Sequence, residues 1–219
     1  MSAFLRFIPP CSPVTAKNVP AGDGWQHEPK LDGYRLQIAK HGRSVRLYSR
    51  RGYDWSTRLS ALAEELRAIP AHSAVVDAEL CFPDRNGAPD FFRLLKAAFE
   101  SQGRELVVYA FDLLHLNGRD LIPLPLVERR TFLERLLGRA KVHCLHLVDA
   151  FTDGQKLLEA AERYKLEGVV SKRKTAPYRS GECYDWVKVK TVSWREANRE
   201  RWRLFEKNKA NALRGGHQP

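Results

Sequence analysis

The chain has 219 residues, 43% of them hydrophobic and 29% charged, which suits one large soluble globular domain. Its net charge of +11 at pH 7 predicts an anionic partner, and nucleic acid is the commonest one. No apolar run approaches the roughly 20 residues that span a bilayer, and the N-terminus has no signal-peptide pattern. We therefore expect a cytoplasmic protein without a membrane partner.

The first half of the sequence predicts an N-terminal arm followed by small β elements. Prolines and glycines in residues 1–27 predict an extended arm that precedes the first strand. Beyond it, alternating apolar and polar residues predict a hairpin, and apolar residues at helical spacing predict a helix that Pro70 ends. The hairpin, the helix and a following strand are expected at 36–40 with 45–49, at 59–69 and at 74–80.

Helices and strands are mixed in the second half. Asp90 is a candidate N-cap of a short helix, and Asn117-Gly118 indicates a turn. Strands are expected at 106–114, 142–147, 168–172 and 186–190, and helices at 127–138 and 154–165. Because the strands do not alternate regularly with helices, the predicted fold class is α+β, with mainly antiparallel sheets flanked by helices. The charged, helix-permissive residues 192–219 predict a basic helical tail.

The hexapeptide that begins at Lys30 and ends at Arg35 carries the first chemical signal. A lysine amine attacks phosphorus when it is deprotonated and in line with the leaving group. We expect Asp32 to orient this amine, Gly33 to let the backbone approach a phosphate, and the Arg35 guanidinium to bind phosphate oxygens. Such a string is also typical of a solvated turn, so the rest of the chain has to decide between the two interpretations.

Two strands carry pairs of like charges. Asp77 and Glu79 lie two residues apart and share one face of a strand, as do Lys188 and Lys190. Like charges repel unless an opposite charge lies between them. The acids therefore predict a metal ion or a bound substrate, and the lysines predict an anion such as a triphosphate.

Two further residues complete a candidate nucleotide site. Glu167 precedes an apolar strand. Phe111 lies within another strand, where it is either part of the core or a flat surface for a base. A lysine nucleophile, acids for a divalent ion, paired lysines for phosphates and an aromatic surface together indicate nucleotidyl transfer through a lysine-bound nucleotide.

Five blocks in this order resemble the adenylation (nucleotidyltransferase) domain of ATP-dependent DNA ligases, most closely the bacterial ligases of end-joining repair. The blocks are 28–35, 49–52, 76–80, 110–114, and 167–173 with 186–190. The resemblance implies an ATP-grasp-like nucleotidyltransferase fold over residues 28–191. Ala78 stands where the family usually has glycine, which is a mild departure.

The resemblance also implies a role for each residue. Lys30 would be the nucleophile that becomes AMP-lysine. ATP would be bound by Glu28, Lys30, Arg35, Arg50, Glu79, Phe111, Lys188 and Lys190, with Glu28 beside adenine and Phe111 stacked on it. Mg²⁺, or alternatively Mn²⁺, would be held by Glu79 and Glu167. DNA would be contacted by Arg35, Arg50 and Arg51.

The implied substrate is nicked double-stranded DNA, and the implied partners are DNA-end-binding or OB-fold-bearing repair proteins. Family members usually continue into an OB-fold, but 29 residues follow Lys190 here, too few for that barrel. We therefore expect a stand-alone adenylation domain whose reaction with ATP is slow or depends on another chain. An RNA ligase or capping-type nucleotidyltransferase remains an alternative, as does a non-catalytic DNA-binding subunit.

Overall fold

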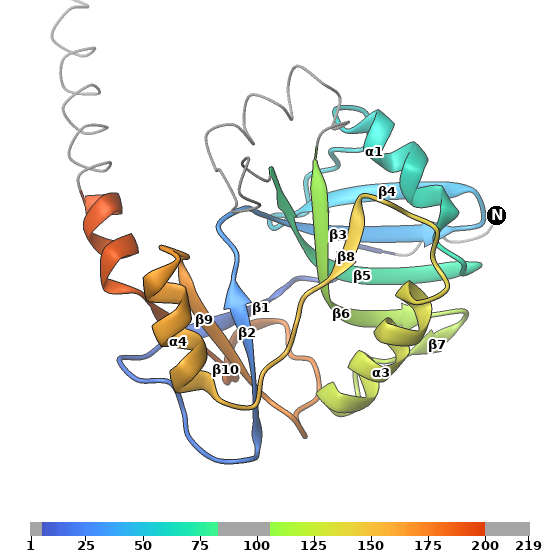
Figure 1. Ribbon diagram of the computed structural model, residues 1–219. Helices are drawn as coiled ribbons and strands as arrows, with labels where there is room; N and C mark the ends of the chain where they lie inside the picture. Colours follow the sequence, from blue (N-terminus) through green and yellow to red (C-terminus); the bar gives the residue numbers. More distant parts are fainter. Residues whose placement is uncertain (1–5, 83–105, 200–219) are drawn as a thin grey trace, which may run out of the picture.

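The structure is a computed structural model that describes residues 6–82 and 106–199 (Figure 1). Two sheets form this part of the chain, and the pairs within them are mainly antiparallel, as the sequence predicts. The exceptions are the parallel pairs β1–β10 and β6–β8. The helix expected after Asp90 lies outside the described residues.

The small sheet has the order β1-β10-β9-β2. Its strands are β1 (Cys11–Thr15), β2 (Trp25–Lys30), β9 (Gly168–Arg173) and β10 (Gly181–Lys190). The expectation that residues 1–27 precede the first strand is wrong, because β1 and the start of β2 fall within them. β1 is an edge strand, where a proline such as Pro13 is tolerated. The prolines in this segment suggested a loop, but the segment contains a strand.

The large sheet has the order β4-β3-β5-β6-β7, with β8 paired to β6. Its strands are β3 (Tyr34–His41), β4 (Ser44–Ser49), β5 (Ser73–Cys81), β6 (Val107–Leu116), β7 (Arg119–Asp120) and β8 (Leu145–Leu147). The predicted β3–β4 hairpin is confirmed, as is the turn after β6. Asn117 and Gly118 both have positive φ there, 48° and 86°, which is typical of a tight Asn-Gly hairpin turn.

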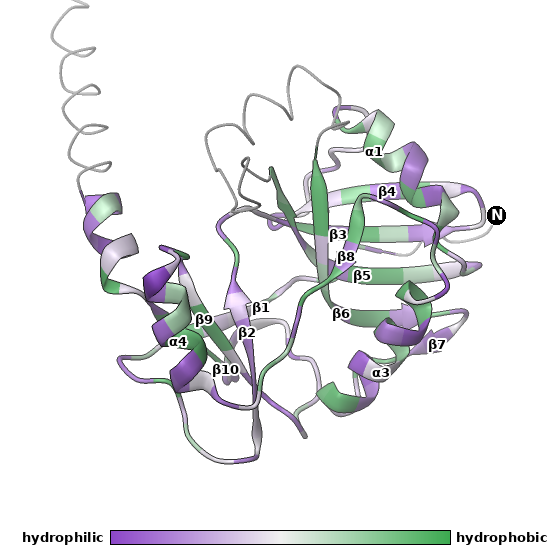
Figure 2. Ribbon diagram, viewed as in Figure 1, coloured by the Kyte–Doolittle hydropathy of each residue, from purple (hydrophilic) through white to green (hydrophobic). Residues whose placement is uncertain are grey.

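Helices cover both sheets (Figures 1 and 2). They are α1 (Ser60–Glu65), continued by the 3₁₀ turn η1 (Leu66–Ala68), α3 (Leu126–Leu137) and α4 (Gly154–Arg163). Residues 192–199 form a further helix after β10. All of the helices in the described ranges fall short of the length and apolar character that crossing a bilayer requires.

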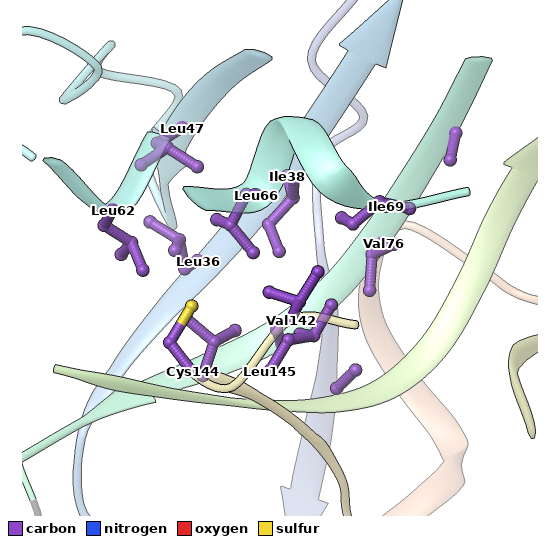
Figure 3. Close-up of a cluster of buried hydrophobic side chains, with 14 of the residues drawn as sticks. Leu36, Ile38, Leu47, Leu62, Leu66, Ile69, Val76, Val142, Cys144 and Leu145 are labelled. Atoms are coloured by element: carbon purple, nitrogen blue, oxygen red, sulfur yellow. The ribbon is translucent and has the colours of Figure 1, made fainter. Parts of the chain in front are cut away.

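The main core lies between the large sheet and its helices. Leu36 and Ile38 of β3 point toward Leu62 of α1 and Leu66 of η1, while Leu145 closes the cluster from β8 (Figure 3). All five side chains are buried. Alternation along β3 thus buries one face against the helices, since successive strand residues point to opposite sides.

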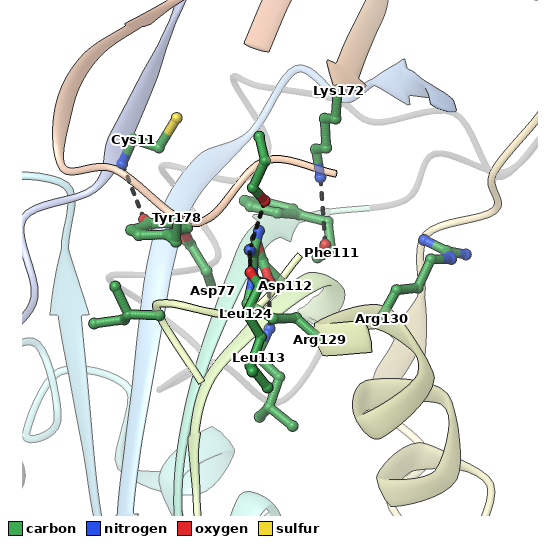
Figure 4. A network of polar contacts seen from close by, with 12 residues as sticks. Cys11, Asp77, Phe111, Asp112, Leu113, Leu124, Arg129, Arg130, Lys172 and Tyr178 are labelled. Carbon is green, nitrogen blue, oxygen red and sulfur yellow. Dashed lines mark hydrogen bonds and ion pairs between the residues drawn. The ribbon is translucent and has the colours of Figure 1, made fainter. Parts of the chain in front are cut away.

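A buried ion pair attaches α3 to the large sheet (Figure 4). The guanidinium of Arg129 donates from Nε and Nη2 to the two carboxylate oxygens of Asp112 on β6, each at 2.8 Å. Its Nη1 donates to the carbonyls of Leu124 and Ala176. Because Ala176 lies between β9 and β10, this one side chain connects both sheets.

Candidate active site

A cavity of about 980 Å³ is lined by residues from both sheets and by the segment that joins β2 to β3. All of the ATP-, metal- and DNA-binding residues expected from the sequence line it. They are Glu28, Lys30, Arg35, Arg50, Arg51, Glu79, Phe111, Glu167, Lys188 and Lys190. Residues that are far apart in the sequence therefore share one site.

The pairing of three strands places Lys30 beside Glu167 and Lys190. Gly168 of β9 pairs with Lys30 of β2 on one side and with Lys190 of β10 on the other. Glu167, one residue earlier, accepts from Lys30 Nζ at Oε2 (2.6 Å) and from Lys190 Nζ at Oε1 (2.9 Å). One carboxylate thus holds two amines in the cavity.

Glycine is required at position 168 for this arrangement. Its φ is +154°, and a Cβ there would lie 2.0 Å from the carbonyl oxygen of Val189. Any larger residue would push β9 and β10 apart, and Glu167 would move away from Lys190.

Lys188 lies on the same strand as Lys190 and also lines the cavity. Burial lowers the pKa of Lys188, and the positive charges of Lys30, Lys190 and Arg50 lower it further. The predicted pair of lysines is therefore part of a larger cationic group. Its mutual repulsion would be relieved by an anion such as a polyphosphate.

The prediction that a metal ion or a bound substrate offsets the charge of Asp77 is wrong. Asp77 is fully buried, and Arg35 donates to its two oxygens from Nε (2.9 Å) and Nη2 (2.6 Å). The Tyr178 hydroxyl donates to the same carboxylate at 2.7 Å, as Figure 4 shows. Glu79, in contrast, lines the cavity, and burial raises its pKa to about 7.

Arg35, Gly33 and Asp32 line the cavity and make contacts beyond those expected. Arg35 lines the cavity but also holds Asp77, and its Nη1 donates to the carbonyl of Cys11. A Cβ at Gly33 would lie 2.3 Å from the carbonyl of Leu80, so this glycine allows close approach of β5 rather than only of a phosphate. The amine of Lys30 bonds to Glu167, while Asp32 accepts from the indole of Trp194 at 3.2 Å. Short-range sequence spacing does not contain these long-range contacts.

The sequence did not predict Lys172, which lines the cavity, or Arg130, which contacts the cavity residue Glu28. Glu28 is buried and accepts from Lys172 Nζ at 2.5 Å and from Arg130 Nη1 at 3.4 Å. The Lys172 ammonium also lies 4.4 Å from the ring centre of Phe111 and 4.2 Å from that of Trp186. A lysine inside the apolar strand β9 is the signal that could have indicated Lys172, because such a lysine requires a buried partner.

The carboxylates in the cavity suit a magnesium ion that is bound jointly with a nucleotide. Mg²⁺ commonly takes one or two carboxylates together with substrate phosphates. Glu79 and Glu167 both line the cavity and supply that number. Over residues 6–82 and 106–199 there is no cluster of three or more His, Cys, Asp or Glu that could hold a metal by protein ligands alone.

Comparisons with known proteins identify one family. A family model described as "ATP dependent DNA ligase domain" matches residues 12–190. The multifunctional non-homologous end joining protein LigD of Pseudomonas aeruginosa is 39% identical over 172 residues, which are 78% of this chain and 20% of LigD. LigD of Mycobacterium tuberculosis H37Rv is 35% identical over 196 residues, which cover 86% of this chain and 24% of that protein.

Solved structures give the same result. A mycobacterial DNA ligase D complexed with ATP and MES has a TM-score of 0.67 and 32% identity, covering 83% of this chain and 59% of that chain. The ligase domain of M. tuberculosis LigD has a TM-score of 0.66 at the same identity, covering 83% and 58%. The chain spans about a fifth to a quarter of the curated LigD relatives. With its fold, its cavity and its five sequence blocks in agreement, the chain belongs to the ATP-dependent DNA ligase domain family.

Proposed function

We propose that this chain is the adenylation unit of an ATP-dependent DNA ligase that seals nicks between a 5′-phosphate and a 3′-hydroxyl. The observation that carries the proposal is the position of Lys30: its amine is held 2.6 Å from Glu167, in a cavity that also contains Lys188 and Lys190. The two sheets, within residues 11–190, would form the adenylation domain, which would act on nicked double-stranded DNA in cytoplasmic repair.

In the first step, the Lys30 amine attacks the α-phosphorus of ATP. A P–N bond forms, and the bond from this phosphorus to the bridging oxygen breaks, so that pyrophosphate leaves with the electron pair. Glu167 Oε2 already accepts a hydrogen bond from the amine and is in position to take its proton. Lys188 and Lys190 offer positive charge to the oxygens of the α-phosphate and the leaving pyrophosphate.

Two transfers complete the reaction. An oxygen of the DNA 5′-phosphate attacks the phosphorus of AMP, and Lys30 leaves as an amine that regains its proton. The 3′-hydroxyl then attacks the activated 5′-phosphate, and AMP departs. Glu79 and Glu167 would hold Mg²⁺, which when bound offsets the negative charge of the phosphates.

The adenine end of the nucleotide would lie near Glu28 and Phe111. Lys172 and Arg130 fix the Glu28 carboxylate, so its oxygens would meet a base in a defined direction. Phe111 offers an aromatic surface in the same cavity. Arg50 and Arg51 are exposed where β4 ends at the cavity, and we assign them to the DNA backbone.

Sealing of a labelled, 5′-phosphorylated nick tests the proposal. We expect ligated DNA with ATP and Mg²⁺, and none with Lys30→Ala. Because the curated relatives are longer, a pre-adenylated nick should be supplied in parallel, with and without an added OB-fold-bearing or DNA-end-binding repair protein. Product from neither substrate under any of these conditions, from folded protein, would contradict the proposal.

Two substitutions of substrate separate the alternatives. Sealing of a nicked RNA in preference to nicked DNA would indicate an RNA ligase, and labelling by GTP in preference to ATP would indicate a capping-type enzyme. Binding of nicked DNA without covalent labelling and without sealing of the pre-adenylated nick would indicate a non-catalytic subunit.

A further inference from the structure

The helix over residues 192–199 lies beside α4 and follows β10 directly (Figure 1). Its first residue with an aromatic side chain, Trp194, contacts two residues that line the cavity. We propose that Trp194 is a positioning residue for nucleotidyl transfer, which acts through Lys190 and Asp32. This inference rests on the proposed function, since it concerns the same site.

The indole of Trp194 contacts both residues at once. The Lys190 Nζ lies 3.8 Å from the ring centre, within the range of a cation–π interaction. The indole Nε1–H donates to Asp32 Oδ2 at 3.2 Å. Lys190 is therefore held between the Trp194 ring and the Glu167 carboxylate, while Asp32 is held two residues beyond the Lys30 nucleophile.

The start of the helix is fastened, so the position of Trp194 is defined. The backbone amides of Val192 and Ser193 donate to the Glu162 carboxylate on α4, at 2.7 and 2.9 Å. The amide of Trp194 itself donates to Thr191 Oγ1 at 3.3 Å. Arg195 then donates from Nε and Nη2 to the carbonyl of Lys190, so the helix also binds the backbone of the strand end.

These contacts restrict the direction of the Lys190 ammonium group. A lysine ammonium sits on a flexible four-carbon stem and adopts many positions unless its neighbours restrict it. The Trp194 ring covers one side of the Lys190 ammonium without supplying a charge that would compete with phosphate. Lys190 is thus oriented for the nucleotide while remaining cationic.

Single-turnover self-adenylation with labelled ATP and Mg²⁺ tests the inference. We expect Trp194→Ala to slow labelling of Lys30 about tenfold and Trp194→Phe about threefold, because phenylalanine keeps a ring for Lys190 but lacks the N–H for Asp32. Glu196→Ala, an exposed residue of the same helix, should label at the wild-type rate.

A second set of variants, made in the Lys190→Ala background, distinguishes a positioning role of Trp194 from a role in folding. In Lys190→Ala, the Trp194→Ala and Trp194→Phe chains should behave alike, because the ring no longer has an ammonium to orient. Equilibrium binding of a fluorescent ATP analogue gives the same comparison if labelling in that background is too slow to time. If Trp194 had a purely structural role, the Trp194→Ala and Trp194→Phe chains would differ by the same factor in the wild-type and Lys190→Ala backgrounds.

The outcomes are distinct. Labelling of Trp194→Ala at the wild-type rate, or a difference that persists without Lys190, would overturn the inference while the proposed function stands. Failure of the wild-type chain to label, with and without the added repair protein, would overturn the inference. Failure to seal the pre-adenylated nick as well would overturn the proposed function.

Discussion

At the scale of single residues, Glu79 shows how burial tunes a site. Removal from water raises its pKa, the nearby positive charges of Lys30 and Arg35 lower it, and the charges of Glu167 and Asp77 raise it again, for a result of about 7. Its carboxyl group therefore changes charge near neutral pH. This makes its ionisation measurable in the stability of the protein as well as in its activity.

We expect Glu79→Gln to change the pH dependence of stability. Between about 4.3, the value for an unfolded glutamate, and about 7, the folded chain keeps a proton that the unfolded chain has lost. The contribution of Glu79 to the free energy of unfolding therefore falls as pH rises through this window. Glutamine does not ionise, so the stability of the variant relative to wild type should increase by about 2 kcal/mol from pH 5 to pH 8.

Urea unfolding at several pH values measures this difference. Glu182→Gln, at an exposed position on β10, is the matched control and should show no comparable trend. A parallel response of wild type and Glu79→Gln over the whole range would contradict the account of Glu79.

Strand periodicity predicts the faces on which the charged side chains lie, but not their partners on other strands. Strand alternation correctly placed Lys188 and Lys190 on one face of β10, and both line the cavity, because the side-chain period of a strand is fixed. It could not foresee that Asp77 is neutralised by Arg35, since that pair joins β3 to β5. Partners across strands depend on register, which the local pattern does not contain.

At the scale of elements, the helices and strands with regular periodicity were predictable from the sequence, and the short strand β1 was not. The β3–β4 hairpin, α3, α4 and β10 follow from periodicity and turn residues. β1 was missed because its short, proline-containing sequence suggests a loop, and only its pairing with β10 makes it a strand. The helix predicted after Asp90 lies outside the described residues and stays a prediction.

The segment between β2 and β3 gives a test at this scale. We expect Gly33→Ala to lower the free energy of unfolding by about 2–3 kcal/mol, because the added methyl would meet the Leu80 carbonyl at 2.3 Å and the Cys81 sulfur at 2.9 Å. Gly24→Ala is the control, since a Cβ there has no atom within 4 Å. Chemical denaturation that gives equal stabilities for the two variants would contradict the packing described for Gly33.

At the scale of the whole molecule, the net positive charge and the arginines at the cavity both indicate a polyanionic partner. The net charge of +11 favours a polyanion, and two exposed arginines, Arg50 and Arg51, stand at the cavity. Arg35 meanwhile joins the two sheets by binding Asp77 of β5 and the carbonyl of Cys11 on β1. The site therefore depends on both sheets being held together.

Binding of nicked DNA should depend strongly on salt. We expect the affinity to fall at least tenfold between 50 and 200 mM salt, because each neutralised phosphate releases counterions. Replacing Arg50 and Arg51 together by alanine should lower the slope of log affinity against log salt by about 2. Arg43→Ala, in the turn at the opposite end of the hairpin, should leave the slope unchanged, as fluorescence anisotropy titrations can establish. An unchanged slope in the double variant would remove these arginines from the DNA interface.

The residue that carries AMP can be identified directly. The chain is incubated with ATP and Mg²⁺, digested, and searched by mass spectrometry for a peptide with an AMP adduct. We expect an acid-labile adduct on Lys30 that is absent from Lys30→Ala and weakened in Glu167→Gln. An adduct on another residue, or labelling that survives in Lys30→Ala, would contradict the assignment of Lys30 as the nucleophile.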